Sequence, residues 1–122
     1  MSATAHAAAV SHTPGLREPT YFVLASLLDG PLHGYAILRR AEELSQGRVR
    51  LSTGTLYGAL DRLTGAGLVD PGQEEVVGGR VRRAYTLTED GRALLAAESA
   101  RLASAARVVA VRIGSQTEPR PA

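Results

Sequence analysis

The sequence predicts a mostly α-helical fold with a two-stranded β-wing, that is, a winged helix-turn-helix followed by one long C-terminal helix. Three observations lead to this fold class. Three helical segments come first, within residues 17–65. Two strand-like runs then flank Gly78-Gly79, and a two-residue glycine loop is typical of a β-hairpin. The last segment, residues 89–113, has the apolar periodicity of a helix.

A chain of 122 residues is expected to form one domain with tails. We expect a disordered N-terminal tail over residues 1–16, because this stretch has no apolar periodicity. The winged helix-turn-helix is expected over residues 17–88, the C-terminal dimerisation helix over 89–113 and a disordered tail over 114–122.

The first two helices are predicted from residues that start or stop helices and from the spacing of apolar residues. Proline suits a first helical turn, so Glu18-Pro19-Thr20 is the expected start of the first helix. Apolar residues surround that helix, which predicts that it is buried, and Gly30-Pro31 ends it. The second helix is expected to run to about Ser45. Its predicted core face consists of Tyr35, Leu38, Ala41 and Leu44.

The third helix is expected to begin at Ser52, whose hydroxyl can accept a free backbone N–H of the first turn. Leu56, Leu60 and Leu63 recur at helical spacing and predict a narrow core stripe. The glycines at 65 and 67 end the helix.

The hairpin is predicted from residues 73–77 and 80–88. Tyr85 and Leu87 should face the core, because only that face of the second strand is large and apolar there. Arginine then occupies both faces of the hairpin tip, and no acid lies between these arginines in the sequence.

Thr88 is the expected cap of the last helix. Nothing obvious in the chain covers the apolar stripe of this helix, and the same helix of a second copy is the economical partner. The expected homodimer interface is Tyr21, Phe22, Leu95, Leu102, Ala106, Val109 and Ile113. The valines at 108, 109 and 111 with Ile113 have an alternative interpretation as the wall of a ligand pocket.

Composition excludes several function classes. The chain has no cysteine, and its three histidines at 6, 12 and 33 lack ligand spacing, so we expect no metal and no cofactor; His33 is expected to cap or pack. No catalytic constellation of residues is present, so an enzyme is not expected. No segment suits a membrane span or a signal peptide, which favours the cytoplasm. The net charge is only +2, yet all fourteen basic residues are arginine, whose planar fork suits phosphate and guanine.

The residues that point to a charged polymer lie at one helix start and one hairpin tip. Ser52, Thr53 and Thr55 supply more hydroxyls than capping needs, and helix N-termini attract phosphate. Tyr57 flanks this helix as a further DNA contact or as core. The candidate DNA-binding arginines are Arg80, Arg82 and Arg83 of the wing, Arg48 and Arg50 before the third helix, and Arg62, which can instead pair with Asp61.

Three segments carry a resemblance to a known family. They read "LLDGPLHGYAILRRAEE", "STGTLYGALDRLTGAGLV" and "GGRVRRAYTLTEDGRALL", in this order with the expected gaps. The chain resembles the PadR family of bacterial transcriptional regulators, in its shorter branch with a single C-terminal helix. The resemblance departs at Thr53 and Gly58, where the family usually has proline.

The resemblance implies a homodimer that binds an inverted-repeat operator in double-stranded DNA, usually as a repressor relieved by a small molecule. Ser52, Thr53, Thr55 and Tyr57 would then contact DNA from the recognition helix, and the wing arginines would contact it from the hairpin. We expect any effector, of unknown identity, to bind at the dimer core near Tyr21, Phe22 and Leu102. Stacking of the effector on indole is excluded, because the chain has no tryptophan. The alternative is a winged-helix protein–protein adaptor that does not bind DNA.

Overall fold

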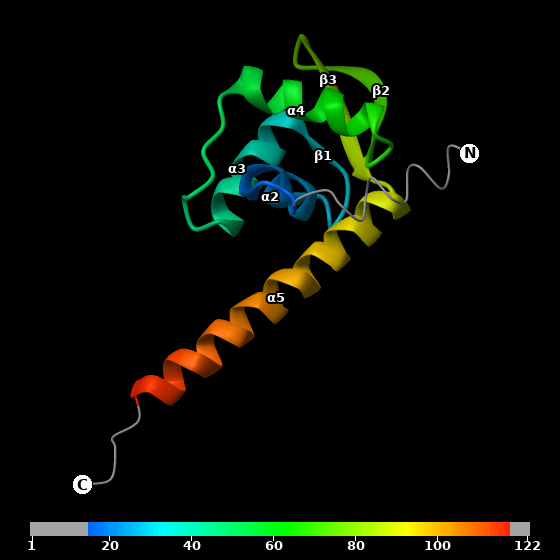
Figure 1. Ribbon diagram of the computed structural model, residues 1–122. Coiled ribbons are helices and arrows are strands. Elements are labelled where there is room, and N and C mark those ends of the chain that lie inside the picture. Colours follow the sequence, from blue (N-terminus) through cyan, green and yellow to red (C-terminus); the bar gives the residue numbers. More distant parts are fainter. Residues whose placement is uncertain (1–14, 118–122) are drawn as a thin grey trace, which may run out of the picture.

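The computed structural model describes residues 15–117, in which one long helix projects from a body of shorter elements (Figure 1). The body contains three helices and a small antiparallel sheet, and α5 extends away from it. The elements in chain order are α2 (Glu18–Ser26), β1 (Leu32–His33), α3 (Gly34–Leu44), α4 (Thr53–Gly65), β2 (Val69–Val77), β3 (Arg80–Leu87) and α5 (Glu89–Thr117).

The predicted fold class is confirmed, with one additional strand. The sheet has the order β1-β3-β2, in which Leu32 pairs with Tyr85 and His33 with Ala84. Two residues are too few to show the alternation that identifies a strand in a sequence, so only the hairpin was predicted. The new strand fixes the start of α3 against the base of the wing.

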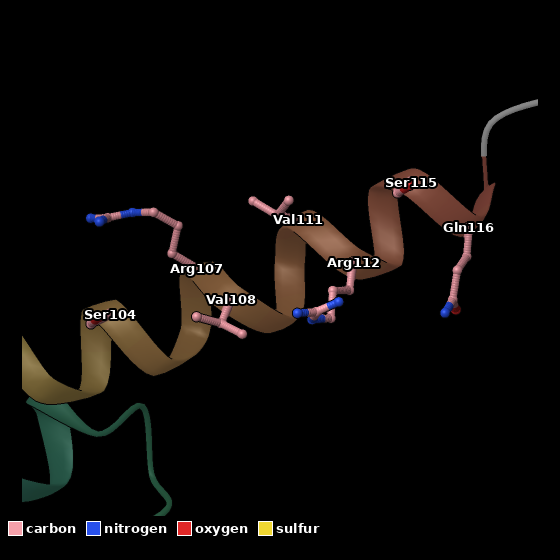
Figure 2. Close-up of a pocket in the computed structure, with 7 residues that line it drawn as sticks. All are labelled: Ser104, Arg107, Val108, Val111, Arg112, Ser115 and Gln116. Carbon is pink, nitrogen blue, oxygen red and sulfur yellow. The ribbon is translucent and has the colours of Figure 1, made fainter.

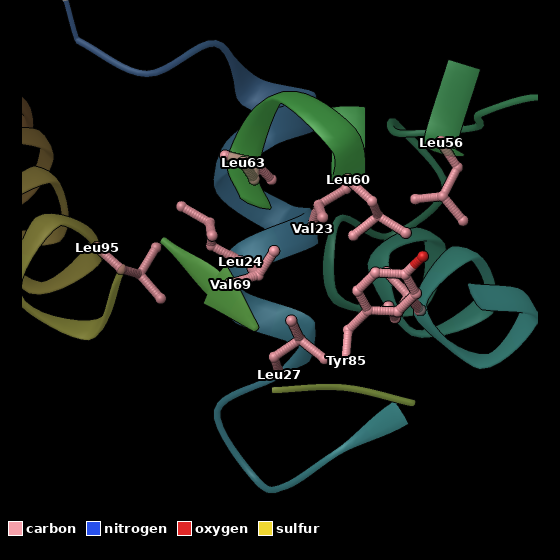
Figure 3. Packing of buried hydrophobic residues seen from close by; sticks show 10 residues of the cluster. Val23, Leu24, Leu27, Leu56, Leu60, Leu63, Val69, Tyr85 and Leu95 are labelled. Carbon is pink, nitrogen blue, oxygen red and sulfur yellow. The ribbon is translucent and has the colours of Figure 1, made fainter. Parts of the chain in front are cut away.

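The core joins α2, α3, α4, the sheet and the first turns of α5 (Figure 3). The predicted core stripe of α4 is confirmed, since Leu56, Leu60 and Leu63 are all buried. Val23 and Leu24 of α2 are fully buried beneath them. These side chains hold α4 on the body, so its opposite face and its N-terminus remain exposed.

The buried face of α3 differs from the prediction. Ala41 is fully buried and Leu38 packs half-buried against the core, as predicted. Tyr35 is instead 71% exposed and Leu44 is 37% exposed, and Ile37, which was not predicted, is fully buried. Gly34 is also buried, because the side chain of Tyr57 lies directly over it. The buried face of α3 is therefore rotated by less than one residue position from the predicted face, and the two faces share Ala41.

The turn of the wing is confirmed. Gly78 and Gly79 have φ values of 57° and 79°, both in the left-handed region that favours glycine. Tyr85 is buried and Leu87 is half-buried at the base of β3, as predicted. Thr88 caps α5, since its hydroxyl accepts from the N–H of Gly91 at 3.0 Å.

Two predicted boundaries move. The last helix continues through Thr117, four residues past its predicted end at 113. Leu16 packs against the core and therefore belongs to the body rather than to a disordered tail. Residues 1–14 and 118–122, including His6 and His12, lie outside the described residues.

Leu95 does not belong to a dimer interface. Its side chain is 4% exposed and packs within the core of its own chain. The first turns of α5 lie against the body, so the apolar stripe is covered there without a second copy (Figure 3). The uncovered part of the stripe begins only at Leu102, which is 42% exposed.

Candidate nucleic-acid interface

The N-terminus of α4 presents hydroxyl groups to solvent. Ser52 is the N-cap, and its Oγ accepts from the N–H of Thr55 at 3.2 Å. The Ser52 hydroxyl also donates to Oγ1 of Thr55 at 2.9 Å. Thr53 is exposed, and its hydroxyl has no hydrogen-bond partner within residues 15–117. Capping thus uses Ser52, which leaves Thr53 and the backbone N–H groups of this turn for an external acceptor.

Tyr57 lies one turn further along α4, with its side chain 41% exposed. Its hydroxyl lies so close to Gly34 that a Cβ at position 34 would collide with it. The glycine of the "HGY" segment is thereby explained by packing against Tyr57. The ring is fixed on the body while its outer edge faces solvent.

Two of the three wing arginines face acids on the neighbouring strand. The register pairs Arg83 with Glu74 and Arg82 with Glu75. Nη2 of Arg83 lies 3.0 Å from Oε1 of Glu74, which forms an ion pair. No acid lies between the wing arginines in the sequence, but two acids of the neighbouring strand face them in the structure. The prediction of an arginine cluster without acids is therefore wrong. Counting back from the Gly78-Gly79 turn would have placed both acids opposite the arginines.

A cleft of about 540 Å³ separates the wing from the starts of α3 and α4. Three wing arginines and the recognition-helix residues Thr53 and Tyr57 share this cleft. Its lining residues are His33, Gly34, Tyr35, Ala36, Leu38, Thr53, Leu56, Tyr57, Arg80, Val81, Arg82 and Arg83. The structure thus brings Thr53 and Tyr57 of α4 together with the wing arginines, whereas the predicted site residues Ser52 and Thr55 do not line the cleft.

Within the cleft, Arg80 and Arg82 are exposed and form no ion pair in the described part of the chain. Arg83 is half-buried, and its Nε is buried without a hydrogen-bond partner in the described residues. His33 is the N-cap residue of α3 but makes no capping hydrogen bond with its side chain, so of its two expected roles, capping or packing, side-chain capping is wrong. Together with Tyr35, it lines the cleft, and sequence patterning identified neither residue as part of the site.

The three remaining candidate arginines lie outside the cleft. The guanidinium of Arg48 forms an ion pair with Glu18, with Nε 3.2 Å from Oε1. Nε of Arg50 donates to the carbonyl of Gly47 at 3.2 Å. Arg62 is exposed on α4, and Asp61 does not form an ion pair with it within residues 15–117. Arg48 is thus the least available of the three for an external phosphate.

The outer half of α5 is exposed along its whole length. Figure 2 shows Val108 and Val111 projecting from this helix beside Arg107 and Arg112, with no other element of the described chain against them. Val109 and Ile113 are each 56% exposed. Since a helix turns about 100° per residue, Val108 and Val111 lie roughly opposite the Leu102–Val109–Ile113 stripe. Two apolar strips therefore run along α5.

Tyr21 and Phe22 are half-buried on α2 and touch each other edge to face, with ring centroids 5.3 Å apart. Among residues 15–117, no group of three or more His, Asp or Glu side chains could hold a metal ion. Within the same range, no helix is long and apolar enough to cross a membrane.

Comparison with known proteins places residues 23–97 within the model of the transcriptional regulator PadR-like family. The chain is 39% identical over 87 residues to the transcriptional regulator Rv3488 of Mycobacterium tuberculosis, which covers 71% of this chain and 78% of that protein. It is 49% identical over 77 residues, 63% of its length, to an uncharacterized 37.1 kDa protein in transposon TN4556 of Streptomyces fradiae. The match spans only 21% of that transposon protein.

Solved structures share the fold at lower identity. A PadR family transcription regulator from Clostridium difficile R20291 superposes with a TM-score of 0.66 at 22% identity, covering 80% of this chain and 99% of that one. Bacillus subtilis PadR, solved in complex with operator DNA, gives a TM-score of 0.57 at 21% identity. That match covers 87% of this chain and 51% of the Bacillus protein.

Proposed function

Because the chain belongs to the transcriptional regulator PadR-like family, we propose that it binds double-stranded DNA as a homodimer and represses transcription at an inverted-repeat operator. The α4 helix enters a major groove, and the wing follows the adjacent backbone or minor groove. The sequence-specific contacts come from the exposed side of α4, where most side chains are short. Shape and backbone readout therefore contribute beside any direct base contact.

The observation that carries this proposal is the cleft between α4 and the wing. Thr53 and Tyr57 line one side, and Arg80, Arg82 and Arg83 line the other. A DNA backbone strand that passes through this cleft meets hydroxyl donors from α4 and charged donors from the wing, which are the groups that bind phosphate. The Bacillus protein, solved with operator DNA, supports the same use of the fold.

The test is binding of the purified protein to the DNA upstream of its own gene, against scrambled DNA, at two salt concentrations. We expect tighter binding to the native fragment and an affinity that falls as salt rises, because each bound phosphate releases counterions. Arg80→Ala and Arg82→Ala should weaken binding to both fragments and flatten the salt dependence by about one unit of slope each. Arg92→Ala, an exposed arginine on α5 outside the cleft, is the matched control.

The homodimer is proposed to form through the outer half of α5. The strip on α5 consists of Leu102, Ala106, Val109 and Ile113. Tyr21 and Phe22 belong to α2, which contacts α5. The exposure of the valines and of Ile113 on a projecting helix supports this, because water-exposed apolar strips of this length mark association surfaces. A C2 dimer would place two recognition helices about one DNA turn apart, ~34–36 Å.

An effector is proposed to act at the dimer core, near Tyr21, Phe22 and Leu102. What supports this is that Tyr21 and Phe22 form an edge-to-face pair of rings and that Leu102 is exposed, since apolar surface of this kind suits a small aromatic molecule. A ligand bound there would shift the dimer between two arrangements of its α5 helices. The test is a panel of small aromatic compounds added to the DNA titration. The idea fails if no compound changes affinity and the free and bound dimers superpose.

A protein–protein adaptor is the second candidate. Val76 and Val81 face each other at the wing tip and are 74% and 65% exposed, so the tip offers an apolar pair that a protein partner could cover. If neither DNA fragment binds at low salt, the adaptor becomes the better explanation. If the native fragment binds tightly, DNA binding is the better explanation for the wing.

A further inference from the structure

The charged side chain of Glu98 is buried on the inner face of α5. Among the described residues it is the only buried charged side chain, at 7% exposure. Glu98 lies three residues after Leu95 and four before Leu102, so it occupies a position of the apolar stripe. A carboxylate there needs charge-assisted partners, because an unpaired buried charge is costly.

The partners are Arg101 and the backbone that precedes α2. Nε of Arg101 donates to Oε1 of Glu98 at 2.9 Å, and Nη2 donates to Oε2 at 2.7 Å. This is the two-pronged geometry that guanidinium forms best with carboxylate. The bonds from Arg101, together with a backbone hydrogen bond from Leu16, hold the pKa of Glu98 below its ordinary value.

The segment of Gly15 and Leu16, here called the strap, lies directly on this pair. A Cβ at Gly15 would collide with the guanidinium of Arg101 and the carboxylate of Glu98. The side chain of Leu16 packs against the core, and the carbonyl of Arg17 accepts the first helical bond of α2 from Tyr21 at 2.9 Å. The strap therefore connects α5 to the start of α2.

Glu98 is also the last buried residue of α5. Every residue from 99 to 116 is exposed, so the Glu98–Arg101 pair is where α5 leaves the body (Figure 1). The direction of the projecting helix is then held by Leu95, by the strap and by Gly91, which is buried against the carbonyl of Leu68, and the strap is the outermost of these points. From residue 98 to residue 113 the helix extends roughly 22 Å, so a tilt of roughly 10° displaces its dimer strip by about 4 Å.

We propose that Glu98 and Arg101 are positioning residues, which lock α5 to the strap and thereby set the separation of the two recognition helices in the dimer. This inference rests on the proposed function, because it needs a dimer formed through α5. Two recognition helices must match half-sites about one DNA turn apart. Without the strap, α5 would be held only by the closely spaced contacts of Gly91 and Leu95 near its start. The separation of the recognition helices would then vary by several ångströms, and part of the binding free energy would be lost in fixing it.

The first experiment measures the separation directly. The chain has no cysteine, so Asp61→Cys introduces one labelling site per protomer, on the exposed side of α4. Spin labels on the two copies report the distance between recognition helices in the DNA-free dimer. We expect a narrow distance distribution in the otherwise unchanged protein and a distinctly broader one with Glu98→Gln. An equally narrow distribution in both would overturn the proposal.

The second experiment measures DNA binding with the upstream fragment, with that fragment carrying one scrambled half-site, and with variants whose half-sites are moved by one base pair. Glu98→Gln should weaken binding to the intact fragment about tenfold and blunt the preference for native spacing, while half-site binding and dimerisation stay unchanged. Gly15→Ala, whose added Cβ collides with the side-chain ends of Arg101 and Glu98, separates the strap from this pair and should act in the same direction. Glu42→Gln, an exposed acid on α3, is the matched control.

Equal losses on the intact and half-site fragments would mean that Glu98 serves folding alone, which would overturn the positioning role. A wild-type chain that sediments as a monomer, or that ignores its upstream DNA, would overturn the proposed function and this inference with it. The two failures are distinguishable, since the second is seen before any variant is made.

Discussion

Arg83 and Glu74 face each other across the wing, with Nη2 of the arginine 3.0 Å from Oε1 of the glutamate. The carboxylate is exposed, whereas the arginine lines the cleft beside α4. The ion pair with Glu74 therefore engages the guanidinium of Arg83, which would otherwise be available to bind phosphate. Exposed ion pairs of this kind contribute little stability, so the pair matters more for charge than for folding.

Glu74→Gln should strengthen binding to native and scrambled DNA alike, by a few-fold at low salt. The freed guanidinium of Arg83 can neutralise one more phosphate, which steepens the slope of log affinity against log salt by about 0.9. Titrations at several salt concentrations measure both quantities. Glu42→Gln controls for the loss of an acid elsewhere on the surface. Weaker binding by Glu74→Gln would instead mean that the ion pair orients Arg83 toward DNA.

Gly58 tests how closely α4 approaches DNA. The position lies inside a helix, and a Cβ added there would meet only the Arg62 guanidinium, at an ordinary 3.7 Å. Gly58→Ala should therefore raise the free energy of unfolding by about 0.5–1 kcal/mol, since alanine is the better helix former. Chemical denaturation measures this gain.

DNA titration of Gly58→Ala then distinguishes two explanations for the glycine at this position. A large loss of affinity in the stabilised variant would mean that DNA lies against the helix backbone at this position. Unchanged affinity would mean that the glycine only weakens the helix. Gly65→Ala, at the end of the same helix and with open space around it, is the comparison variant.

Much of the fold follows from sequence patterns that are local. The leucines of α4 recur at helical spacing, and the Gly78-Gly79 turn requires the left-handed backbone that glycine adopts. The prediction for α3 was right at Ala41 and Leu38 but wrong at Tyr35, because Tyr35 and Ile37 are both apolar and spacing alone does not choose between them. The burial of Gly34 under Tyr57 is a tertiary contact that adds to the observed face. Tertiary contacts of this kind leave no periodic trace in the sequence.

Only part of the candidate site could be predicted, because tertiary packing also decides which residues line it. The hydroxyls before α4 and the wing arginines were identifiable from their positions in the chain, whereas His33 and Tyr35 join them only through the packing of α3. The burial of Glu98 was not predicted from the sequence. A carboxylate is stable within the apolar stripe only because Arg101 and the strap contact it, and these contacts are seen only in the structure.

Glu98 should make folding stability depend on pH in the acid range. Its folded pKa lies below the ordinary value of 4.5, because Arg101 donates to the charged carboxylate. The ion pair therefore contributes stability above about pH 4.5, and this contribution is lost as pH falls through the folded pKa. Thermal unfolding between about pH 6 and pH 3 should show a smaller fall in Tm for Glu98→Gln than for wild type. Glu42→Gln should keep the wild-type profile; identical profiles for Glu98→Gln and wild type would contradict the role of the pair.

Substitutions at Leu95 and Ile113 of α5 should affect two different properties, folding and dimerisation. Leu95 is buried in its own core, so Leu95→Ala should lower the free energy of unfolding by about 2–5 kcal/mol through the lost contacts and the cavity. Ile113 is 56% exposed within a single copy, so Ile113→Glu should leave the fold of each copy intact. It should shift the sedimentation of the protein from dimer to monomer, because a buried unpaired carboxylate is costly.

Ala103→Glu is the matched control for the added charge, since this exposed position lies between the two apolar strips. It should sediment as wild type does. If Ile113→Glu also remains dimeric, the strip is not the interface, and the two copies associate elsewhere. If it becomes monomeric and loses operator binding while half-site binding persists, DNA recognition depends on the paired arrangement that α5 provides.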